Sequence, residues 1–219
     1  MNASEVQQLY QSRFGGKDAY RLGVWHILNR DYFQEFIGPT DTVLDLGAGY
    51  GEFINTIQCG TKYALDLNPD TKERAGSDVE VLMQDSSRPW PLPDGCLDVV
   101  FTSNFFEHVS DKKTLEQIVL EAKRCLKPGG RLIAMGPNIK YLPGAYWDFL
   151  DHYIPLTEQS LSQLFELTGL QVEKCIDRFL PYTMSQGQQY PLFFTSLYLR
   201  LPLAWRFFGK QFLVIGCKT

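Results

Sequence analysis

Short apolar runs recur along the chain and alternate with longer stretches of helical spacing. The runs lie at Thr42–Leu46, Tyr63–Leu67, Val79–Met83, Leu97–Phe101 and Arg131–Met135. The clearest helical stretch, 112–126, precedes the last run and is closed by the sequence KPGG. Strands that are apolar along their whole length are typical of a parallel sheet covered by helices on both faces. The pattern therefore predicts a doubly wound α/β domain.

Further elements flank this central pattern. Residues 3–12 and about 18–37 have the spacing of helices, and so has the stretch 157–168. Two more strands are predicted at 170–180 and 211–218. The order of elements is that of an α/β domain with helical and strand extensions.

The chain length is that of one domain. We expect residues 1–219 to form it, with a helical cap at 1–40 and substrate-side insertions at 139–156 and 180–210. The five cysteines are scattered and form no CxxC pair, and three histidines without an HExxH motif predict no metal site. The N-terminus lacks the apolar segment of a signal peptide, and no apolar run is long enough to span a bilayer. These features predict a cytoplasmic protein.

A glycine-rich turn follows the first apolar run. The sequence from Val43 to Phe53 reads as a strand, a turn with glycines at Gly47, Gly49 and Gly51, and the start of a helix. Glycine lets a backbone turn tightly and approach a ligand closely. The spacing GxGxG differs from the GxGxxG of dinucleotide sites, and no Walker A motif is present.

Two acidic residues follow the next strands in the same register. Asp66 ends the second run, and Asp85 follows the third. At the carboxyl edge of a parallel sheet, an acid in the position of Asp66 can accept hydrogen bonds from both hydroxyls of a ribose. A carboxylate at Asp85 can accept from an adenine amino group. Three consecutive strand ends thus predict a nucleoside site.

With these motifs the chain resembles the class I S-adenosylmethionine-dependent methyltransferases. The resemblance covers roughly residues 40–137 and is carried by VLDLGAGYGEF, ALDLNPD, MQDSS, LDVVFTSNFFEHV and LKPGGRLIAMGPN. It implies a seven-stranded, mostly parallel Rossmann-like sheet whose last strand is antiparallel. It also implies S-adenosylmethionine as cofactor, with S-adenosylhomocysteine as its product. The cofactor residues that it implies are Asp45, Gly47, Ala48, Gly49, Asp66, Leu67, Asp85, Ser86 and Asn104.

The segment after the fifth run is rich in aromatic and acidic residues. Flat aromatic faces beside carboxylates can stack on a sugar ring or surround an amine. The candidate substrate residues are Tyr141, Tyr146, Trp147, Asp148 and Asp151. If the acceptor is a hydroxyl, its proton needs a base, and His152 is the candidate because imidazole titrates near neutrality. His108, in FFEHV, is expected to start a helix.

The leading interpretation is methyl transfer to a small or lipid-linked acceptor. The stretch YWDFLDHYIPLTEQSL, with FLPYT and the C-terminal sequence, resembles bacterial methyltransferases of surface polysaccharide and glycolipid assembly, which favours a sugar hydroxyl. An N-methyltransferase of a small amine and a non-catalytic cofactor-binding module remain alternatives. The GxGxG spacing and the predicted antiparallel ending argue against a nicotinamide-dependent oxidoreductase.

Charge is unevenly distributed along the chain. The net charge is −4, which argues against a nucleic-acid partner, but from Arg178 to the C-terminus there are five basic residues and no acid. The stretch 190–210 is apolar on nearly every side and is interrupted by Pro191 and Pro202. Such a segment must pack against its own domain, a second copy of the chain or a membrane surface.

Overall fold

The computed structural model describes residues 4–5, 7–8, 11, 18–182 and 189–219. The chain forms two compact units, one of Met1–Asp85 and Thr183–Pro202, the other of Ser86–Tyr182 and Leu203–Thr219. The predicted helix at 3–12 falls largely outside the described residues, as does part of the predicted insertion at 180–210.

The first unit holds three parallel strands and the helices that follow them. Its elements are α2 (Asp18–Asp31), η1 (Phe33–Glu35), β1 (Thr42–Leu46), α3 (Glu52–Thr56), β2 (Thr61–Asp66), α4 (Pro69–Arg74), β3 (Val79–Met83) and α7 (Phe193–Leu199). β2 pairs with β1 and β3, so that Leu46 lies opposite Leu65 and Asp66 lies opposite Met83. β1 and β2 contribute to the unit's core, since Leu44 and Leu46 of β1 and Ala64 of β2 are fully buried.

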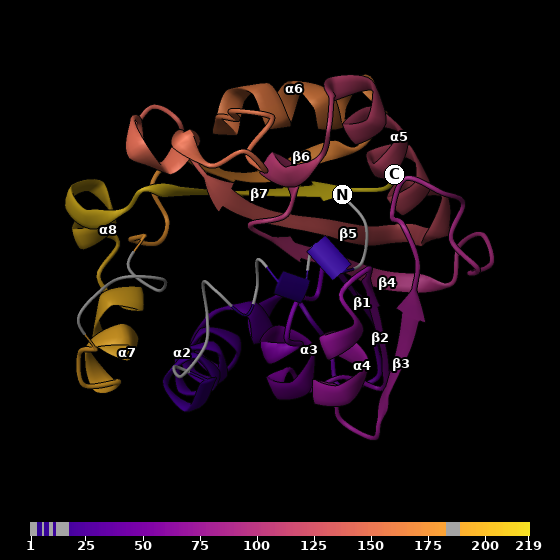
Figure 1. Ribbon diagram of the computed structural model, residues 1–219, viewed down its shortest axis with the longest axis horizontal. Coiled ribbons are helices and arrows are strands. Elements are labelled where there is room, and N and C mark those ends of the chain that lie inside the picture. Colours follow the sequence, from indigo (N-terminus) through magenta and orange to yellow (C-terminus); the bar gives the residue numbers. More distant parts are fainter. Residues whose placement is uncertain (1–3, 6, 9–10, 12–17, 183–188) are drawn as a thin grey trace. The chain divides into compact units, whose positions relative to one another are not determined.

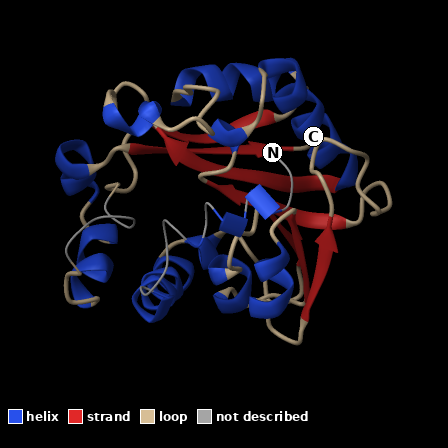
Figure 2. Cartoon of the chain, in the orientation of Figure 1, coloured by secondary structure: helices blue, strands red, loops and turns tan. Residues whose placement is uncertain are grey.

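The second unit holds four strands with two long helices. Its elements are β4 (Leu97–Ser103), η2 (Phe106–His108), α5 (Lys112–Cys125), β5 (Leu126–Pro137), η3 (Ala145–Asp148), α6 (Glu158–Leu167), β6 (Gln171–Ile176), nearly all of α8 (Pro202–Phe208), and β7 (Gln211–Cys217). α6 packs on β6 and β7, as Figures 1 and 2 show. Its apolar residues Leu161 and Phe165 are fully buried.

The strand order confirms the predicted fold class. The seven strands are ordered β3-β2-β1-β4-β5-β7-β6, and β7 runs antiparallel to both β5 and β6. The other recorded pairings, β1 with β2, β2 with β3 and β4 with β5, are parallel. This is the mostly parallel Rossmann-like sheet with an antiparallel last strand.

Two predicted boundaries differ from the structure. The helix predicted to reach residue 37 ends at Asp31, because Tyr32 leaves the helical conformation and Phe33 turns into the core against Trp25. The KPGG sequence does not lie outside the sheet but forms the first part of β5. There a Cβ on Gly130 would lie only 2.9 Å from the carbonyl oxygen of Lys127 and 3.0 Å from that of Asp98. The glycine is therefore required by close backbone approach.

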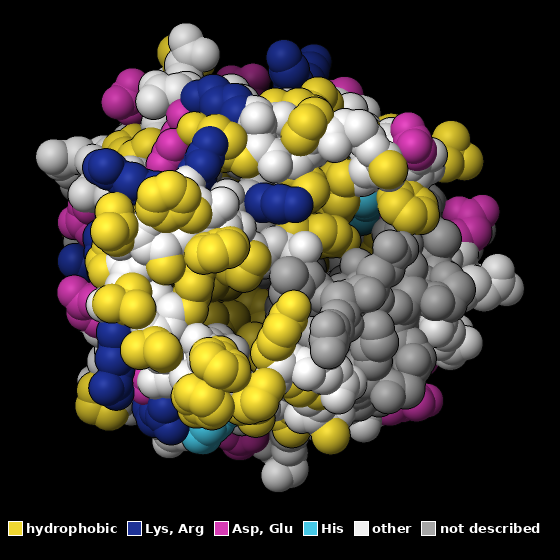
Figure 3. Space-filling view, turned by 90° about the vertical axis from the view of Figure 1, so that its left-hand side faces the viewer, with side chains coloured by type: hydrophobic (Ala, Val, Ile, Leu, Met, Phe, Trp, Pro, Cys, Tyr) yellow, Lys and Arg dark blue, Asp and Glu magenta, His cyan; other side chains and the backbone are white. Residues whose placement is uncertain are grey.

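The apolar stretch 190–210 forms two short helices, α7 and α8. Many of their large side chains are exposed, including Phe193 at 61%, and Phe207 at 73%. The face of the molecule in Figure 3 shows such hydrophobic side chains next to lysine and arginine side chains. No helix among the described residues has the length and apolar character needed to cross a membrane.

Candidate cofactor and substrate site

The glycine turn begins where β1 ends, in the first unit. Gly47, Gly49 and Gly51 have φ values of 71°, 56° and 73°, a left-handed conformation that favours glycine. The N–H of Gly47 donates to the carbonyl oxygen of Leu65 at 2.9 Å, which ties the turn to β2. The predicted residues Gly47, Ala48 and Gly49 are thus brought beside the end of β2.

Asp66 joins this turn to the loop that follows β2. One carboxylate oxygen accepts from the N–H of Gly49 and the other from the N–H of Asn68, both at 2.7 Å. A carboxylate oxygen has two lone pairs, so each can accept a further hydrogen bond. Asp66 therefore fits the predicted ribose contact, and it also shapes the turn. Leu67 is half-buried beside it.

Asn68 and Thr71, which were not predicted as site residues, stabilise the loop after β2 and the glycine turn. Asn68 is fully buried, and its side chain caps α4 by accepting from the N–H of Asp70 at 3.0 Å. The hydroxyl of Thr71 donates to the carbonyl oxygen of Gly49 at 2.6 Å. The sequence NPD directly after a strand could have predicted the cap formed by Asn68, since asparagine followed by proline is typical of a helix N-terminus.

Asp45 lies on β1 and is 3% exposed. Burial raises its pKa well above the usual value, and the nearby carboxyl groups of Asp66 and Glu52 raise it further. Glu52 forms an ion pair with Arg21 at 2.8 Å, so the attraction for a cation comes from Asp45 and Asp66. This arrangement fits a cofactor with a positively charged sulfur and an ammonium group, and no phosphate.

Asp85 lies at the end of the first unit. Because Asp66 is opposite Met83, Asp85 lies two residues beyond the neighbouring strand and is half-buried. The remaining predicted cofactor residues, Ser86 and Asn104, belong to the second unit. The carbonyl oxygen of Ser86 accepts from the indole N–H of Trp90 at 3.0 Å.

Asn104 follows β4 in a strained backbone conformation. Among the described residues it is the only one other than glycine with a positive φ, at 51°. Its N–H donates to the carbonyl oxygen of Met135 at 2.9 Å, and its side-chain N–H donates to Ser103 at 2.9 Å. Within the described part of the chain, its Oδ1 is buried without a hydrogen-bond partner. Strain and an unsatisfied acceptor are both typical of a ligand site.

A cluster of acidic, aromatic and histidine side chains forms in the second unit after β4 and η3. Glu107, 1% exposed, accepts from the hydroxyl of Tyr146 at 2.7 Å. Nδ1 of His108 lies 3.1 Å from the carboxylate of Asp151, and Nδ1 of His152 lies 2.5 Å from the carbonyl oxygen of Tyr146. We call Glu107, His108, Tyr146, Asp151 and His152 the histidine cluster.

Ring packing orders the histidine cluster. The ring of His152 stacks on Tyr146 with centroids 4.2 Å apart and meets His108 edge-on at 4.8 Å. Burial raises the pKa of Glu107. Burial lowers the pKa of His108, but hydrogen bonding to Asp151 and the charge of Glu107 outweigh this effect, so its pKa lies above the ordinary value.

The structure separates the predicted substrate residues into two groups. Tyr146, Asp151 and the predicted base His152 belong to the histidine cluster, and Trp147 packs beside it with its ring centroid 5.2 Å from that of Tyr146. Asp148 is exposed. Tyr141 lies elsewhere and donates its hydroxyl to Asp177 at 2.7 Å.

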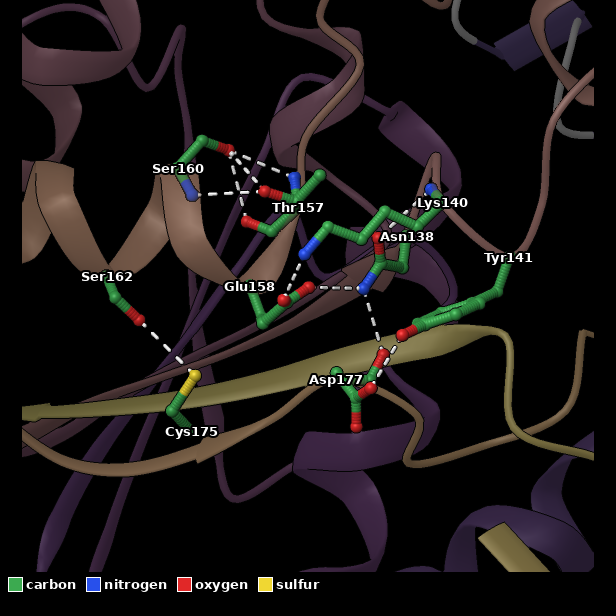
Figure 4. Close-up of polar contacts among 9 residues, drawn as sticks. All are labelled: Asn138, Lys140, Tyr141, Thr157, Glu158, Ser160, Ser162, Cys175 and Asp177. Atoms are coloured by element: carbon green, nitrogen blue, oxygen red, sulfur yellow. Dashed lines mark hydrogen bonds and ion pairs between the residues drawn. The ribbon is translucent and has the colours of Figure 1, made fainter. Parts of the chain in front are cut away.

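The surroundings of Tyr141 form a separate polar network, shown in Figure 4. The side-chain N–H of Asn138 donates to Glu158 at 2.7 Å and to the carbonyl oxygen of Asp177 at 2.9 Å. Lys140 forms an ion pair with the other carboxylate oxygen of Glu158. This network joins the end of β5 to the first turn of α6. The contacts of Glu107 with Tyr146 and of His108 with His152 were not predicted from the sequence.

Comparison with known proteins bears on the family of the chain. Residues 44–134 match the family described as "Methyltransferase domain". The chain is 27% identical over 160 residues to a sarcosine/dimethylglycine N-methyltransferase of Halorhodospira halochloris, covering 62% of this chain and 56% of that protein. It is 30% identical over 138 residues to a Mycolicibacterium smegmatis protein described as a probable S-adenosylmethionine-dependent methyltransferase, covering 55% and 52%.

The fold is similar to that of solved methyltransferases. A methyltransferase from Archaeoglobus fulgidus described as SAM-dependent matches with a TM-score of 0.69 at 20% identity, covering 96% of this chain and 98% of that one. The chain spans only about half the length of the two relatives named above. The family match, the strand order and the glycine turn with Asp66 agree, and the chain therefore contains a class I S-adenosylmethionine-dependent methyltransferase domain.

Proposed function

We propose that this protein transfers the methyl group of S-adenosylmethionine to a hydroxyl of a small or lipid-linked acceptor, in the first place a sugar. The observation that carries this proposal is the histidine cluster. A hydroxyl must lose its proton as it is methylated, and His152 offers an imidazole for that purpose. The half-buried ring of Trp147 offers a flat face of the kind that stacks on sugars, whereas the ring of Tyr146 is buried and stacks on His152.

The residues of the two units fit the reaction. When bound, S-adenosylmethionine supplies an electrophilic methyl carbon, whose bond to sulfur breaks as the bond to the acceptor oxygen forms. Asp66 holds the ribose, and the glycine turn lets the backbone approach the methionine part. Nδ1 of His152 is bound to a carbonyl oxygen, so this nitrogen carries the hydrogen and Nε2 is the basic nitrogen that takes the acceptor's proton.

A small amine is the alternative acceptor. The similarity to a sarcosine/dimethylglycine N-methyltransferase favours it, as do the acids beside Trp147. Carboxylates and aromatic faces together attract a protonated amine. A third candidate, a non-catalytic module, would bind the cofactor and methylate nothing.

We also propose that the acceptor is reached at the inner face of a membrane. α7 exposes Phe193 and Phe194, α8 exposes Phe207 and Phe208, and the chain from residue 178 onward is basic. Exposed aromatic residues among basic ones are typical of proteins that lie on an anionic lipid surface. Such binding would bring the protein to the membrane that holds a lipid-linked acceptor.

An acceptor screen tests the proposed function. The purified chain and S-adenosylmethionine are incubated separately with nucleotide sugars, lipid-linked sugars and small amines, and products are detected by the added mass of one methylene group. We expect methylation of a sugar, and His152→Ala should lower turnover about 10²–10⁴-fold with cofactor affinity unchanged. Methylation of amines alone would favour the alternative. Cofactor binding without any product would favour the non-catalytic module.

A further inference from the structure

Three metal-ligating side chains meet in the second unit from two separate segments. His108 ends η2, whereas Asp151 and His152 follow η3. One ligand atom from each of the three lies within 4.8 Å of the others. Asp151 is 5% exposed, and the two histidines are half-buried. The side chains therefore form a small, largely enclosed site rather than an exposed group of charges.

Backbone carbonyls orient both imidazole rings. Nδ1 of His152 lies 2.5 Å from the carbonyl oxygen of Tyr146, and Nδ1 of His108 lies 2.9 Å from that of Asp151. A carbonyl only accepts, so in each ring Nδ1 carries a hydrogen, and in the neutral ring Nε2 carries the lone pair. Histidine ligands of metals are held in this way, with the second nitrogen donating to a carbonyl or carboxylate.

The three ligand atoms lie close enough to converge on one ion after local movement. Two ligand atoms that each lie about 2.0–2.2 Å from a tetrahedral zinc ion are about 3.3–3.6 Å apart. The widest separation in the cluster, up to 4.8 Å, therefore has to close by about 1.2–1.5 Å. The carboxylate of Asp151 contacts Nδ1 of His108 at 3.1 Å, so binding an ion together with Nε2 of His108 requires the Asp151 side chain to rotate away from Nδ1.

The donor set selects the class of metal. Imidazole nitrogens suit zinc, iron, copper and nickel, whereas magnesium and calcium prefer sites made of oxygen ligands. A buried carboxylate supplies negative charge beside a dication. We propose that His108, Asp151 and His152 bind one divalent transition metal ion of the zinc type.

The metal's role rests on the proposed function. An acceptor hydroxyl bound to the ion becomes more acidic, as metal-bound water does. The proton leaves to solvent while the oxygen keeps its electron pair for the bond to the methyl carbon. With metal bound, His152 would act on the acceptor through the ion rather than by taking the proton itself. No electron transfer is involved.

Direct metal binding tests the site without an acceptor. The chelator-treated full chain is titrated with ZnCl₂ by calorimetry and with CoCl₂ by visible absorption, which reports the ligand type. We expect one ion per chain, and at least a tenfold loss of affinity in His108→Gln and in His152→Gln. His26→Gln, at an exposed position on α2, is the matched control and should bind as the wild type does. Circular dichroism without metal checks that each variant is folded.

The competing ligands are thiols, and Cys175 is exposed. Cobalt spectra with thiolate bands that vanish in Cys175→Ser, or equal binding by the histidine variants, would overturn the proposed site. So would the absence of stoichiometric binding by the wild type. If chelated protein methylates a hydroxyl at the full rate, the metal's role is wrong and the proposed function stands. If metal binds as expected but no hydroxyl is methylated, the site stands and the proposed function fails.

Discussion

Asp66 contacts the glycine turn and the following loop together, so its removal should affect cofactor binding in two ways. Asp66→Ala removes the acceptor for the ribose and releases the N–H groups of Gly49 and Asn68. Hydrogen bonds to a charged group are each worth about 1.5–3 kcal/mol. Since about 1.4 kcal/mol is tenfold in affinity, we expect at least about tenfold weaker binding of S-adenosylmethionine by calorimetry. Equal affinity in a folded variant would remove Asp66 from the site.

Replacing Asp45 should raise the stability of the fold but weaken cofactor binding. Its raised pKa means that the folded state favours the protonated form, so its contribution to stability is present at low pH and is lost as pH rises. Asp45→Asn cannot ionise and avoids that loss. We expect a higher melting temperature than the wild type at pH 8, a smaller difference at pH 5, and weaker cofactor binding. A lower melting temperature at pH 8 with unchanged affinity would contradict this account.

Site residues at the ends of neighbouring strands could be predicted from the sequence, whereas contacts made by distant loops could not. Gly47 and Asp66 follow strands in a fixed order, so their meeting was predictable from the sequence. The partners of His152 were not, because His108 lies 44 residues earlier and only the folded loop after η3 brings the rings together. The positive φ of Asn104 was equally hidden, since asparagine also occupies ordinary strand ends.

A carboxylate joins α2 to α7 and should make their association sensitive to acid. Asp31 accepts from Arg30 at 2.6 Å and from the hydroxyl of Ser196 at 2.5 Å. The hydrogen bond from Arg30 lowers the pKa of Asp31 to about 2, despite the opposing effect of partial burial. A lowered pKa stabilises the fold above about pH 4 and loses that contribution as pH falls toward 2.

Unfolding by urea at several pH values measures this contribution. We expect the wild type to lose stability between about pH 4 and pH 2, and Asp31→Asn to lose less over the same range. Glu116→Gln, at an exposed position on α5, is the control and should follow the wild type. A variant whose stability falls as steeply as that of the wild type would show that Asp31 does not carry the effect.

Strand positions were more predictable than element ends. β1 and β3 lie where the apolar runs predicted them. β1 is buried from Val43 to Leu46, as an apolar run predicts, whereas β3 is only partly buried along its length. The end of α2 was misplaced because the packing of Phe33, rather than helix propensity, decides it. The start of β5 was misplaced because the glycines of KPGG were interpreted as a helix stop, whereas they allow backbone contact with β4.

At the scale of the molecule, the acidic part of the chain is proposed to attract the cofactor, and the basic part an anionic surface. The first 177 residues hold all 25 acidic residues, and the acids around Asp45 suit a cationic cofactor. The remaining chain is basic and carries the exposed aromatic residues of α7 and α8. The cofactor and an anionic surface are thereby attracted to different parts of the chain.

This division predicts binding to anionic lipid vesicles. Each basic residue near an anionic surface contributes about 1 kcal/mol, an attraction that salt screens. We expect the protein to float with vesicles that contain anionic lipid at low salt, less so at high salt, and less with neutral vesicles. The triple variant Arg200→Gln, Arg206→Gln and Lys210→Gln should bind more weakly at an unchanged melting temperature.

A separate variant tests how far exposed apolar side chains contribute to vesicle binding. Phe207 is 73% exposed, so Phe207→Ser should weaken vesicle binding in neutral and anionic vesicles alike, whereas the basic variants act only through the anionic lipid. If the helices instead pack against a second copy of the chain, sedimentation would show a dimer that Phe207→Ser dissociates, and vesicles would not bind. The membrane proposal requires that vesicle binding depend both on the basic residues and on the exposed apolar side chains. The absence of flotation at low salt would end it and leave α7 and α8 as a surface between copies of the chain.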